Sequence, residues 1–540
     1  MGLDAIIISE SGKEGSTGII PERLLLDGKP CSIQVVLNYL KHGGRVVKPV
    51  DGDGMMSWWS APKLNGIYLD SYLTKQGFNV RLINKYFKER DYFCDLLKQG
   101  PRAVIISSTF IRGKHSLREI ADDIRNLAPD IFIIAGGSFV YLSYLVFRRS
   151  HEKGYISDSD KDDLLFFNTD EPSVDFYIAS LLGEPILCEA LKRIKQNRPL
   201  NDLPNSAQYI GNEYSFTARI DDIPNAGDMS VDWNILPDSI FKSGVIPLQT
   251  SKGCPYKCAF CNFTRDRRLM IIKPVDRLVH EMKDISGRGA SYVWFVDDNF
   301  RHGRTDLNSV CRSFIDNGID LKWMTMVRAD TLKHVDAELL RESGCIEVQL
   351  GLESADPDIL RNMNKKAGPE LYRDVVREML GAGINCSCYF IFGFPGETDE
   401  TVLRTQEFIK DVEHPELEGT LSWSLFPFSL YPMSPIYEVE ERKKYGLTGY
   451  LRDWKHSTMD STRAMEHVRE TFFELDNSCP TYRGDNLNIL LNLTPHQRKS
   501  FLVSRHRLSK AALNRKIEKD EIIAFFSKAL SNPSHPEAVS

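Results

Sequence analysis

Two separate stretches of the chain alternate short apolar segments with amphipathic helical segments, and this alternation constrains the fold most strongly. The rhythm predicts β-α-β units and therefore an α/β protein with parallel sheets. With 540 residues, the chain is too long for one hydrophobic core. We therefore expect an N-terminal domain at residues 1–186, a linker at 187–242, a second domain at 243–432 and a mostly helical C-terminal domain at 433–540.

The N-terminal domain is predicted to be a doubly wound, Rossmann-like sheet. Its predicted strands are Ala5–Ser9, Val80–Ile83, Ala103–Ser108, Ile131–Ala135 and Leu164–Phe167. Such sheets bind ligands at the carboxyl ends of their strands, where glycines allow close approach and hydroxyls can bond amide groups. The small or polar residues at these ends are Ser107, Ser108 and Thr109, then Gly136, Gly137 and Ser138, then Thr169, Asp170, Glu171 and Pro172.

The second domain contains six apolar segments with helical patterns between them. Its predicted strands are Val245–Thr250, Tyr292–Val296, Leu321–Val327, Glu347–Leu350, Ser387–Phe392 and Thr420–Phe426. Six β-α units predict a partial (β/α)6 barrel of the TIM type, whose functional site lies at the carboxyl ends of the strands.

Three cysteines follow the first of these strands with the spacing C-x3-C-x2-C, namely Cys254, Cys258 and Cys261. Three thiolates on one loop can hold three irons of a [4Fe-4S] cluster and leave the fourth iron open. A structural zinc site is the alternative, but zinc needs a fourth ligand, and the nearest downstream histidine, His280, lies in a predicted helix. The spacing therefore favours a cluster.

The ends of the later strands carry groups that can bind an ammonium, a carboxylate and an adenine. Asp297 and Asp298 can accept hydrogen bonds from an ammonium or from hydroxyls, and Arg328 can clamp a carboxylate. The glycines of the segment 393–396 let the backbone approach an adenine.

The cysteine motif, with Phe260 directly before its last cysteine, resembles the signature of the radical S-adenosylmethionine (SAM) superfamily. The strand-end segments resemble the family's acidic motif, its strand-three arginine, its G-L-E-S motif and its F-G-F-P-G-E-T motif. The resemblance implies a SAM site made by Phe260, Asp297, Asp298, Arg328, Glu353, Ser354, Gly393, Phe394 and Pro395.

The N-terminal domain looks like the cobalamin-binding domain that precedes many radical SAM domains. The resemblance implies cobalamin contacts from Ser107, Ser108, Thr109, Gly136, Gly137, Ser138, Asp170 and Glu171. The D-x-H-x-x-G motif is absent from the sequence, so we expect no protein histidine below the cobalt, although His42 and His115 stay possible ligands. A Rossmann-like module that mediates dimerisation or binds nothing is the alternative.

The resemblance implies a cobalamin-dependent radical SAM methyltransferase that methylates an unactivated carbon of a small molecule or peptide and takes electrons from flavodoxin or ferredoxin. One alternative is ring formation or rearrangement without net methyl transfer. A second is a tRNA methylthiotransferase, but only Cys31, Cys94 and Cys188 precede the motif, widely spread. A third is a non-enzymatic scaffold.

Composition limits the environment and the partners. The formal charge of -6 provides no broad basic field, so we expect no nucleic-acid partner. No apolar stretch is long enough for a membrane span, and no secretory signal is evident, so a cytoplasmic protein is expected. Cys386 and Cys388 share one strand face, where buried structural thiols are favoured over a second metal site. The helical region after Ser434 is expected to be a lid or a stabilising extension.

Overall fold

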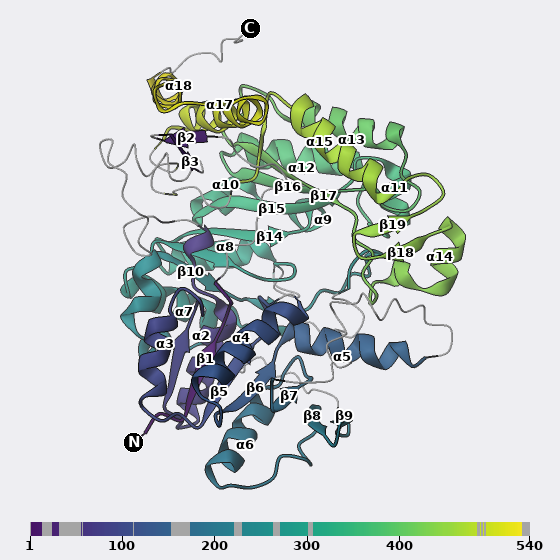
Figure 1. Ribbon diagram of the computed structural model, residues 1–540. Helices are drawn as coiled ribbons and strands as arrows, with labels where there is room; N and C mark the ends of the chain where they lie inside the picture. Colours follow the sequence, from purple (N-terminus) through teal and green to yellow (C-terminus); the bar gives the residue numbers. More distant parts are fainter. Residues whose placement is uncertain are drawn as a thin grey trace. The chain divides into compact units, whose positions relative to one another are not determined.

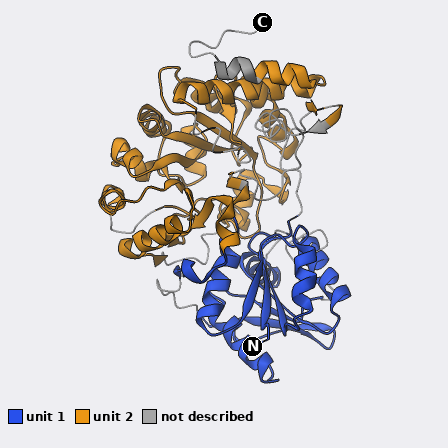
Figure 2. Cartoon of the chain, turned by 90° about the vertical axis from the view of Figure 1, so that its left-hand side faces the viewer, with its two compact units in different colours: residues 1–15, 62–237 blue, residues 16–61, 238–540 orange. Residues whose placement is uncertain are grey.

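The computed structural model describes residues 2–12, 24–26, 28–31, 56, 58–111, 113–152, 173–220, 229–262, 271–300, 306–482, 487, 490 and 493–531. The chain forms two compact units, shown in blue and orange in Figure 2. Unit 1 comprises residues 1–15 and 62–237, and unit 2 comprises residues 16–61 and 238–540.

Unit 1 is built on a seven-stranded sheet with the order β4-β1-β5-β6-β7-β8-β9. The strands from β4 to β7 are parallel, whereas β8 and β9 are antiparallel. Their bounds are β1 Ala5–Ile8, β4 Val80–Ile83, β5 Ala103–Ser107, β6 Phe132–Gly136, β7 Phe176–Ile178, β8 Ser206–Ile210 and β9 Glu213–Phe216. The predicted parallel α/β sheet is confirmed, and the strand expected at 164–167 lies outside the described residues.

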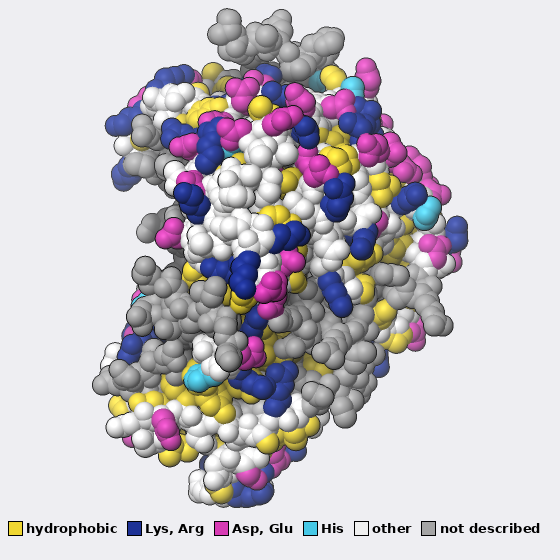
Figure 3. Space-filling view, turned by 90° about the vertical axis from the view of Figure 1, so that its right-hand side faces the viewer, with side chains coloured by type: hydrophobic (Ala, Val, Ile, Leu, Met, Phe, Trp, Pro, Cys, Tyr) yellow, Lys and Arg dark blue, Asp and Glu magenta, His cyan; other side chains and the backbone are white. Residues whose placement is uncertain are grey.

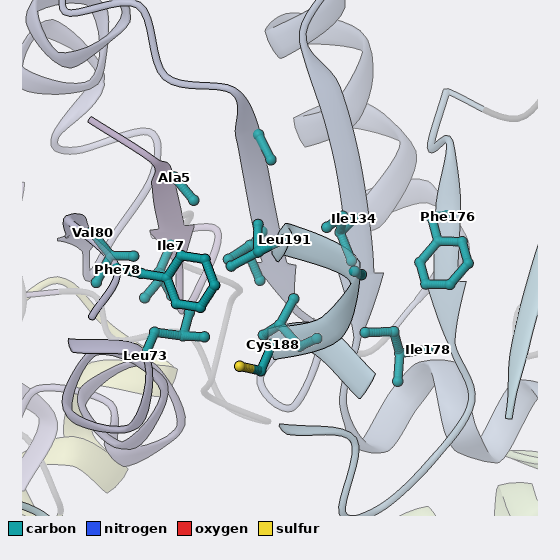
Figure 4. Close-up of a cluster of buried hydrophobic side chains, with 14 of the residues drawn as sticks. Ala5, Ile7, Leu73, Phe78, Val80, Ile134, Phe176, Ile178, Cys188 and Leu191 are labelled. Carbon is teal, nitrogen blue, oxygen red and sulfur yellow. The ribbon is translucent and has the colours of Figure 1, made fainter. Parts of the chain in front are cut away.

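One hydrophobic cluster of unit 1 lies between this sheet and the helices α2 (Leu64–Lys75) and α6 (Glu184–Lys195). Figure 4 shows Ile7 and Ile134 of the sheet beside Leu73 of α2 and Leu191 of α6. Each of these four side chains is almost fully buried, so they hold the layers together mainly by removing apolar surface from water. The remaining helices of unit 1 are α3 (Arg90–Leu97), α4 (Lys114–Leu127) and α5 (Ser138–Ser150).

The segment 187–242, where a linker is expected, contains regular secondary structure. Most of α6 and the whole β8-β9 hairpin fall within it and belong to unit 1. Leu187 and Leu191 recur at helical spacing and are buried, which explains the helix. Asn197, Asn205 and Asn212 lie at turns of this segment, and all three have positive φ angles.

Unit 2 is built on a second seven-stranded sheet, with the order β10-β13-β14-β15-β16-β17-β20 and every pair parallel (Figure 1). The strands are β10 Val245–Leu248, β13 Tyr292–Phe295, β14 Lys322–Val327, β15 Cys345–Glu353, β16 Asn385–Phe392, β17 Leu421–Pro427 and β20 Cys479–Pro480. The six predicted barrel strands are therefore present, and the short β20 extends the sheet beyond the prediction. Helices between these strands are α7 Val275–Gly287, α8 Leu307–Asp316, α9 Ala329–Leu332, α10 Ala337–Glu342, α11 Pro357–Asn362, α12 Pro369–Gly381 and α13 Asp399–Val412.

An insertion between β1 and α2, residues 16–61, belongs to unit 2. Its hairpin of β2 (Leu24–Leu26) and β3 (Lys29–Cys31) joins the C-terminal helices, since Leu25 N donates to Ile517 O at 2.9 Å. Trp58 packs edge-on against Tyr292 and Trp294 of β13. The insertion thus contributes apolar side chains to two hydrophobic clusters of unit 2, Leu24 to one and Trp58 and Ala61 to the other.

The C-terminal region contributes α14 (Val439–Tyr445), the hairpin β18 (Thr448–Tyr450) and β19 (Asp453–Lys455), α15 (Ser461–Glu474), α17 (Pro495–Asn514) and α18 (Lys519–Ser531). The predicted C-terminal helices are confirmed, and the β18-β19 hairpin is an addition. Among the described helices, none has the length and apolar character needed to cross a bilayer.

Candidate active site

The three motif cysteines lie on a loop closed at its base by a short hairpin. Strand β11 (Ser251–Lys252) precedes the loop and pairs antiparallel with β12 (Ile271–Ile272), which follows it. Within the loop, Cys261 N donates to Cys258 O at 3.1 Å, which makes a tight turn. Ala259 N donates to Met363 O, and Ile436 N donates to Ala259 O, each at 2.9 Å. The loop is thereby held to the carboxyl end of the sheet from both sides.

The chemistry of these thiols suits a cluster whose irons are bound separately. None of the ten cysteines with described side chains forms a disulfide. Within the described residues, no three His, Cys, Asp or Glu side chains are arranged around a single metal ion. A [4Fe-4S] cluster does not require three side chains around one ion, because each cysteine ligates a different iron of the cluster.

Asp297 and Asp298 follow β13 and both hold the cysteine loop. Asp297 is buried, and its Oδ1 accepts from Thr250 N at 2.8 Å and Ser251 N at 2.5 Å. Its Oδ2 accepts from Thr250 Oγ1 at 2.8 Å. Asp298 Oδ2 accepts from Gly253 N at 3.0 Å, directly before Cys254. Burial raises the pKa of Asp297 to about 7 despite these hydrogen bonds.

Arg328 follows β14 and is buried beside the cysteine loop. Its Nε and Nη2 donate to the two carboxylate oxygens of Asp330, both at 2.8 Å. Its Nη1 lies 3.8 Å from Cys258 Sγ, and its Cζ lies 3.7 Å from the centre of the Tyr256 ring. The structure therefore brings Arg328 to the cysteines, with one edge of the guanidinium occupied by Asp330.

Glu353 ends β15, where the pairing with β16 is irregular, and Ser354 follows it. Glu353 has φ +69°, a left-handed conformation that is unusual for a side chain other than glycine, and its Oε1 accepts from Lys365 Nζ at 3.3 Å. Ser354 is fully buried and its hydroxyl accepts from Asp356 N at 3.1 Å. Ser354 thus supports the start of α11 from within the core.

A buried tyrosine adds a polar atom to this edge. Tyr372 of α12 is 1% exposed, and its hydroxyl has no hydrogen-bond partner among the described residues. Burial raises its pKa, and the nearby carboxylate of Glu353 raises it further. A buried hydroxyl of this kind favours a site that receives a polar group.

The turn after β16 requires glycine at position 393. Gly393 has φ +88°, and a Cβ there would come within 2.4 Å of Trp454 Cη2. Glu397 folds back, and its carboxylate accepts a hydrogen bond from Gly393 N. The next residue, Phe394, is buried and packs edge-on against Phe260 of the cysteine loop, with ring centres 6.5 Å apart. The turn and the cysteine loop are therefore in direct contact. The carbonyl oxygen of Pro395, in the same turn, accepts a hydrogen bond from Asn362 Nδ2 at 3.3 Å.

The carboxyl edge of the unit 1 sheet forms a cradle of small and polar groups. Ser108 Oγ donates to Gly136 O at 2.7 Å and accepts from Val140 N at 3.1 Å, which joins β5 to the start of α5. Gly137 has φ +100°, and a Cβ there would lie 3.1 Å from Ser108 N and 3.2 Å from Thr109 Oγ1. Ser138 begins α5 directly after this contact.

Two residues that sequence analysis did not single out lie on the same edge. Asn65 of α2 donates through Nδ2 to Ser107 Oγ at 2.8 Å and to Ser9 O at 3.1 Å. Its Oδ1 and the hydroxyl of Ser9 are buried with no partner among the described residues. Unpaired buried oxygens beside a glycine cradle fit a flat ligand rimmed by amides. The expected contacts Asp170 and Glu171 lie outside the described residues, as does His42.

Side chains on one face of the unit 2 sheet form a further candidate surface. Met326 of β14 and Phe426 of β17 are 38% and 48% exposed, although each belongs to a strand with a buried opposite face. Tyr389 of β16 lies between them in the strand order, 6.1 Å from Phe426 by ring centres, and its hydroxyl donates to Gln349 Oε1 at 3.3 Å. Only the period-two alternation of these strands could have indicated this face from sequence.

Cys386 and Cys388 belong to the opposite face of β16. Both are buried, and burial raises the pKa of each thiol. Cys386 Sγ approaches Val376 O of α12 at 3.9 Å. These contacts agree with the expected structural thiols.

Acidic and basic side chains alternate over the described surface in Figure 3 and do not gather into one broad patch. This distribution agrees with the small negative formal charge of the chain.

Comparison with known proteins gives matches to both parts of the chain. Residues 248–409 match the family model described as Radical SAM superfamily. The uncharacterised methyltransferase PH0819 of Pyrococcus horikoshii is 22% identical over 76% of this chain and 84% of its own length. The structure of the radical SAM methyltransferase TsrM of Kitasatospora setae, with tryptophan substrate and a SAM analogue bound, is 15% identical, with a TM-score of 0.60, and the match covers 97% of each chain. The cobalamin-dependent SAM radical enzyme OxsB, with aqua-cobalamin and SAM bound, is 15% identical, with a TM-score of 0.58, over 98% of this chain and 84% of its own.

Proposed function

We propose that the chain, whose residues 248–409 match the Radical SAM superfamily, is a cobalamin-dependent radical SAM methyltransferase. It reductively cleaves SAM and methylates an unactivated carbon of a small molecule or peptide. A low-potential reductant such as flavodoxin or ferredoxin supplies the electrons. The fold shared with TsrM and OxsB over nearly the whole chain supports this class.

The observation that carries the proposal is the closed loop that presents Cys254, Cys258 and Cys261 at the carboxyl end of a parallel sheet. Such a loop holds three irons of a [4Fe-4S] cluster. When bound, the cluster supplies the electron that converts SAM to methionine and a 5′-deoxyadenosyl radical. Asp297 and Asp298 keep the loop in place through its backbone, as the hydrogen bonds to Thr250, Ser251 and Gly253 indicate.

The strand-end turns of unit 2 are proposed to bind SAM beside the loop. The Gly393 turn, where no side chain intervenes, is proposed to lie against the adenine, and Phe260 and Phe394 join this turn to the cysteines. Glu353 and the unpaired hydroxyl of Tyr372 provide polar atoms for the remainder of the cofactor. Met326, Tyr389 and Phe426 present an apolar, partly aromatic face for the substrate.

Unit 1 is proposed to bind cobalamin at the edge formed by Asn65, Ser107, Ser108 and Gly137. When bound, methylcobalamin supplies the methyl group that is transferred. The glycine cradle admits a flat ring system, and the Ser107 hydroxyl and the unpaired Oδ1 of Asn65 can bond its rim.

Anaerobic reconstitution followed by metal analysis tests the proposal directly. We expect about four irons per chain and binding of hydroxocobalamin, seen as a shift of its visible absorption bands. With SAM and dithionite, the reconstituted protein should release 5′-deoxyadenosine, and a Cys258→Ser variant should not. Iron without 5′-deoxyadenosine formation would contradict the radical chemistry, and the absence of cobalamin binding would contradict the role of unit 1.

The rival activity, ring formation or rearrangement, keeps the same cofactors. The likeness in fold to the cobalamin-dependent SAM radical enzyme OxsB supports this second candidate. Methyl transfer leaves S-adenosylhomocysteine when the cobalamin is remethylated from SAM, whereas a rearrangement leaves none. Mass spectrometry of the reaction mixture therefore separates the two.

A further inference from the structure

The guanidinium of Arg328 has little capacity left for a ligand carboxylate. A bidentate clamp uses two parallel N–H groups along one edge of the fork. In Arg328, the edge formed by Nε and Nη2 is already paired with both oxygens of Asp330. The face of the group stacks on Tyr256, and the side chain is only 10% exposed. To bind Arg328, a carboxylate of a ligand would have to displace Asp330 from the Nε–Nη2 edge. Otherwise it would have to reach the buried guanidinium along the side that carries Nη1.

The remaining nitrogen of the guanidinium points to the cysteine loop. Nη1 lies 3.8 Å from Cys258 Sγ, within the range of an N–H···S hydrogen bond. The backbone of Arg328 is fixed as well, because its N–H donates to Asn299 Oδ1 at 3.2 Å. Asp330, Tyr256 and Asn299 therefore hold the charged group against this sulfur.

A hydrogen bond to a thiolate ligand and a nearby positive charge both act on the reduction potential of an iron–sulfur cluster. Reduction adds one negative charge, and a buried cation next to a ligand sulfur stabilises the reduced form. Because Arg328 is buried, solvent screens its charge less than it would at the surface. Asp330 partly offsets that charge.

We infer that Arg328 raises the reduction potential of the cluster through Cys258 and does not serve as the carboxylate clamp for SAM. The inference rests on the proposed function, since it requires a cluster on the cysteine loop. In this arrangement Arg328 positions and tunes a ligand of the cluster, and Asp330 sets how much of the positive charge the cluster experiences.

The test is the midpoint potential of the reconstituted cluster in the absence of SAM, measured by an anaerobic redox titration followed by EPR. We expect Arg328→Gln to make reduction harder, with roughly a tenfold smaller equilibrium constant, or about 59 mV for one electron. Arg328→Lys keeps the charge and should shift the potential less. Asp330→Asn removes the countercharge and should shift the potential in the opposite direction. Arg341→Gln, a change at an exposed ion pair on α10, serves as the matched control and should leave the potential unchanged.

The outcomes separate the two roles of Arg328. If the SAM-free potential of Arg328→Gln equals that of the wild type while its SAM affinity falls, the residue is a clamp and the inference is wrong. If Arg328→Gln does not retain the cluster, the midpoint potential of Asp330→Asn tests the inference instead. An unchanged midpoint potential in Asp330→Asn would also overturn it. A wild-type protein without iron would instead contradict the proposed function itself.

Discussion

The Nε2 atom of His456 lies 3.1 Å from the carbonyl oxygen of Gly393. Thr458 N donates to Nδ1 of the same ring at 3.3 Å, so Nδ1 is the acceptor and Nε2 carries the proton that is donated to Gly393. Burial lowers the pKa of His456, which keeps the ring neutral. The C-terminal region therefore braces the turn proposed to bind adenine.

Replacing His456 tests this brace. His456→Leu leaves the Gly393 carbonyl without its buried donor and should cost about 1–3 kcal/mol of stability. His456→Gln retains a donor and should recover part of the loss. Thermal unfolding and SAM affinity check both variants, and equal behaviour of Leu and Gln would show that the hydrogen bond is unimportant.

Gly393→Ala should be strongly destabilising, by at least about 2 kcal/mol, because the new Cβ meets Trp454 and the backbone has a positive φ. Gly381→Ala is the matched control, since Gly381 ends α12 and has no atom within 4 Å of a new Cβ. Chemical unfolding compares the two. Similar stability of both variants would contradict the close packing against Trp454.

Glu397 should make stability depend on pH. Burial raises its pKa from 4.5 to about 8, and its Oε1 has no hydrogen-bond partner among the described residues. The folded protein therefore binds a proton more tightly than the unfolded chain does, so the contribution is full below about pH 4.5 and is lost as the pH rises through about 8. Glu397→Gln should flatten the melting temperature over this window. A slope equal to that of the wild type would contradict the raised pKa.

Gly137→Ala should weaken hydroxocobalamin binding by at least roughly tenfold. The added methyl group would enter the contact with Ser108 and Thr109 at the carboxyl edge of the unit 1 sheet. Gly77→Ala provides the control, because Gly77 also has a positive φ, +84°, but no neighbour within 4 Å of a new Cβ. Titrations followed by visible absorption measure both affinities. An equal loss in the two variants would assign the effect to backbone strain alone.

Replacing Cys386 and Cys388 together by alanine should not change the iron content of the reconstituted protein. Their sulfurs lie in the core under α12, on the opposite sheet face from Met326 and Phe426. The expected effect is on stability, since two buried side chains are shortened. Iron analysis and thermal melting check this, and a loss of iron would indicate a second metal site.

Local patterns predicted the repeating strands and helices and the cysteine loop well. Strands such as 80–83 and 292–295 are short, apolar and followed by an amphipathic helix, which are signals contained in neighbouring residues. The conformation of Glu353 could not be predicted, because it arises from an irregular pairing between two strands. The position of Trp58 could not be predicted either, because the sequence of a long insertion does not indicate which hydrophobic cluster its apolar residues join.

That insertion also limits how the protein can be divided into fragments. Strand β1 lies in the interior of the unit 1 sheet, hydrogen-bonded to β4 and β5. Residues 16–61, which follow it, belong to unit 2, and the chain re-enters unit 1 at residue 62. A gene fragment encoding 62–237 would lack this central strand. A fragment encoding 1–237 would include the apolar residues of the insertion without the parts of unit 2 against which they pack. Recombinant isolation of the smaller unit therefore requires replacing residues 16–61 by a short connector.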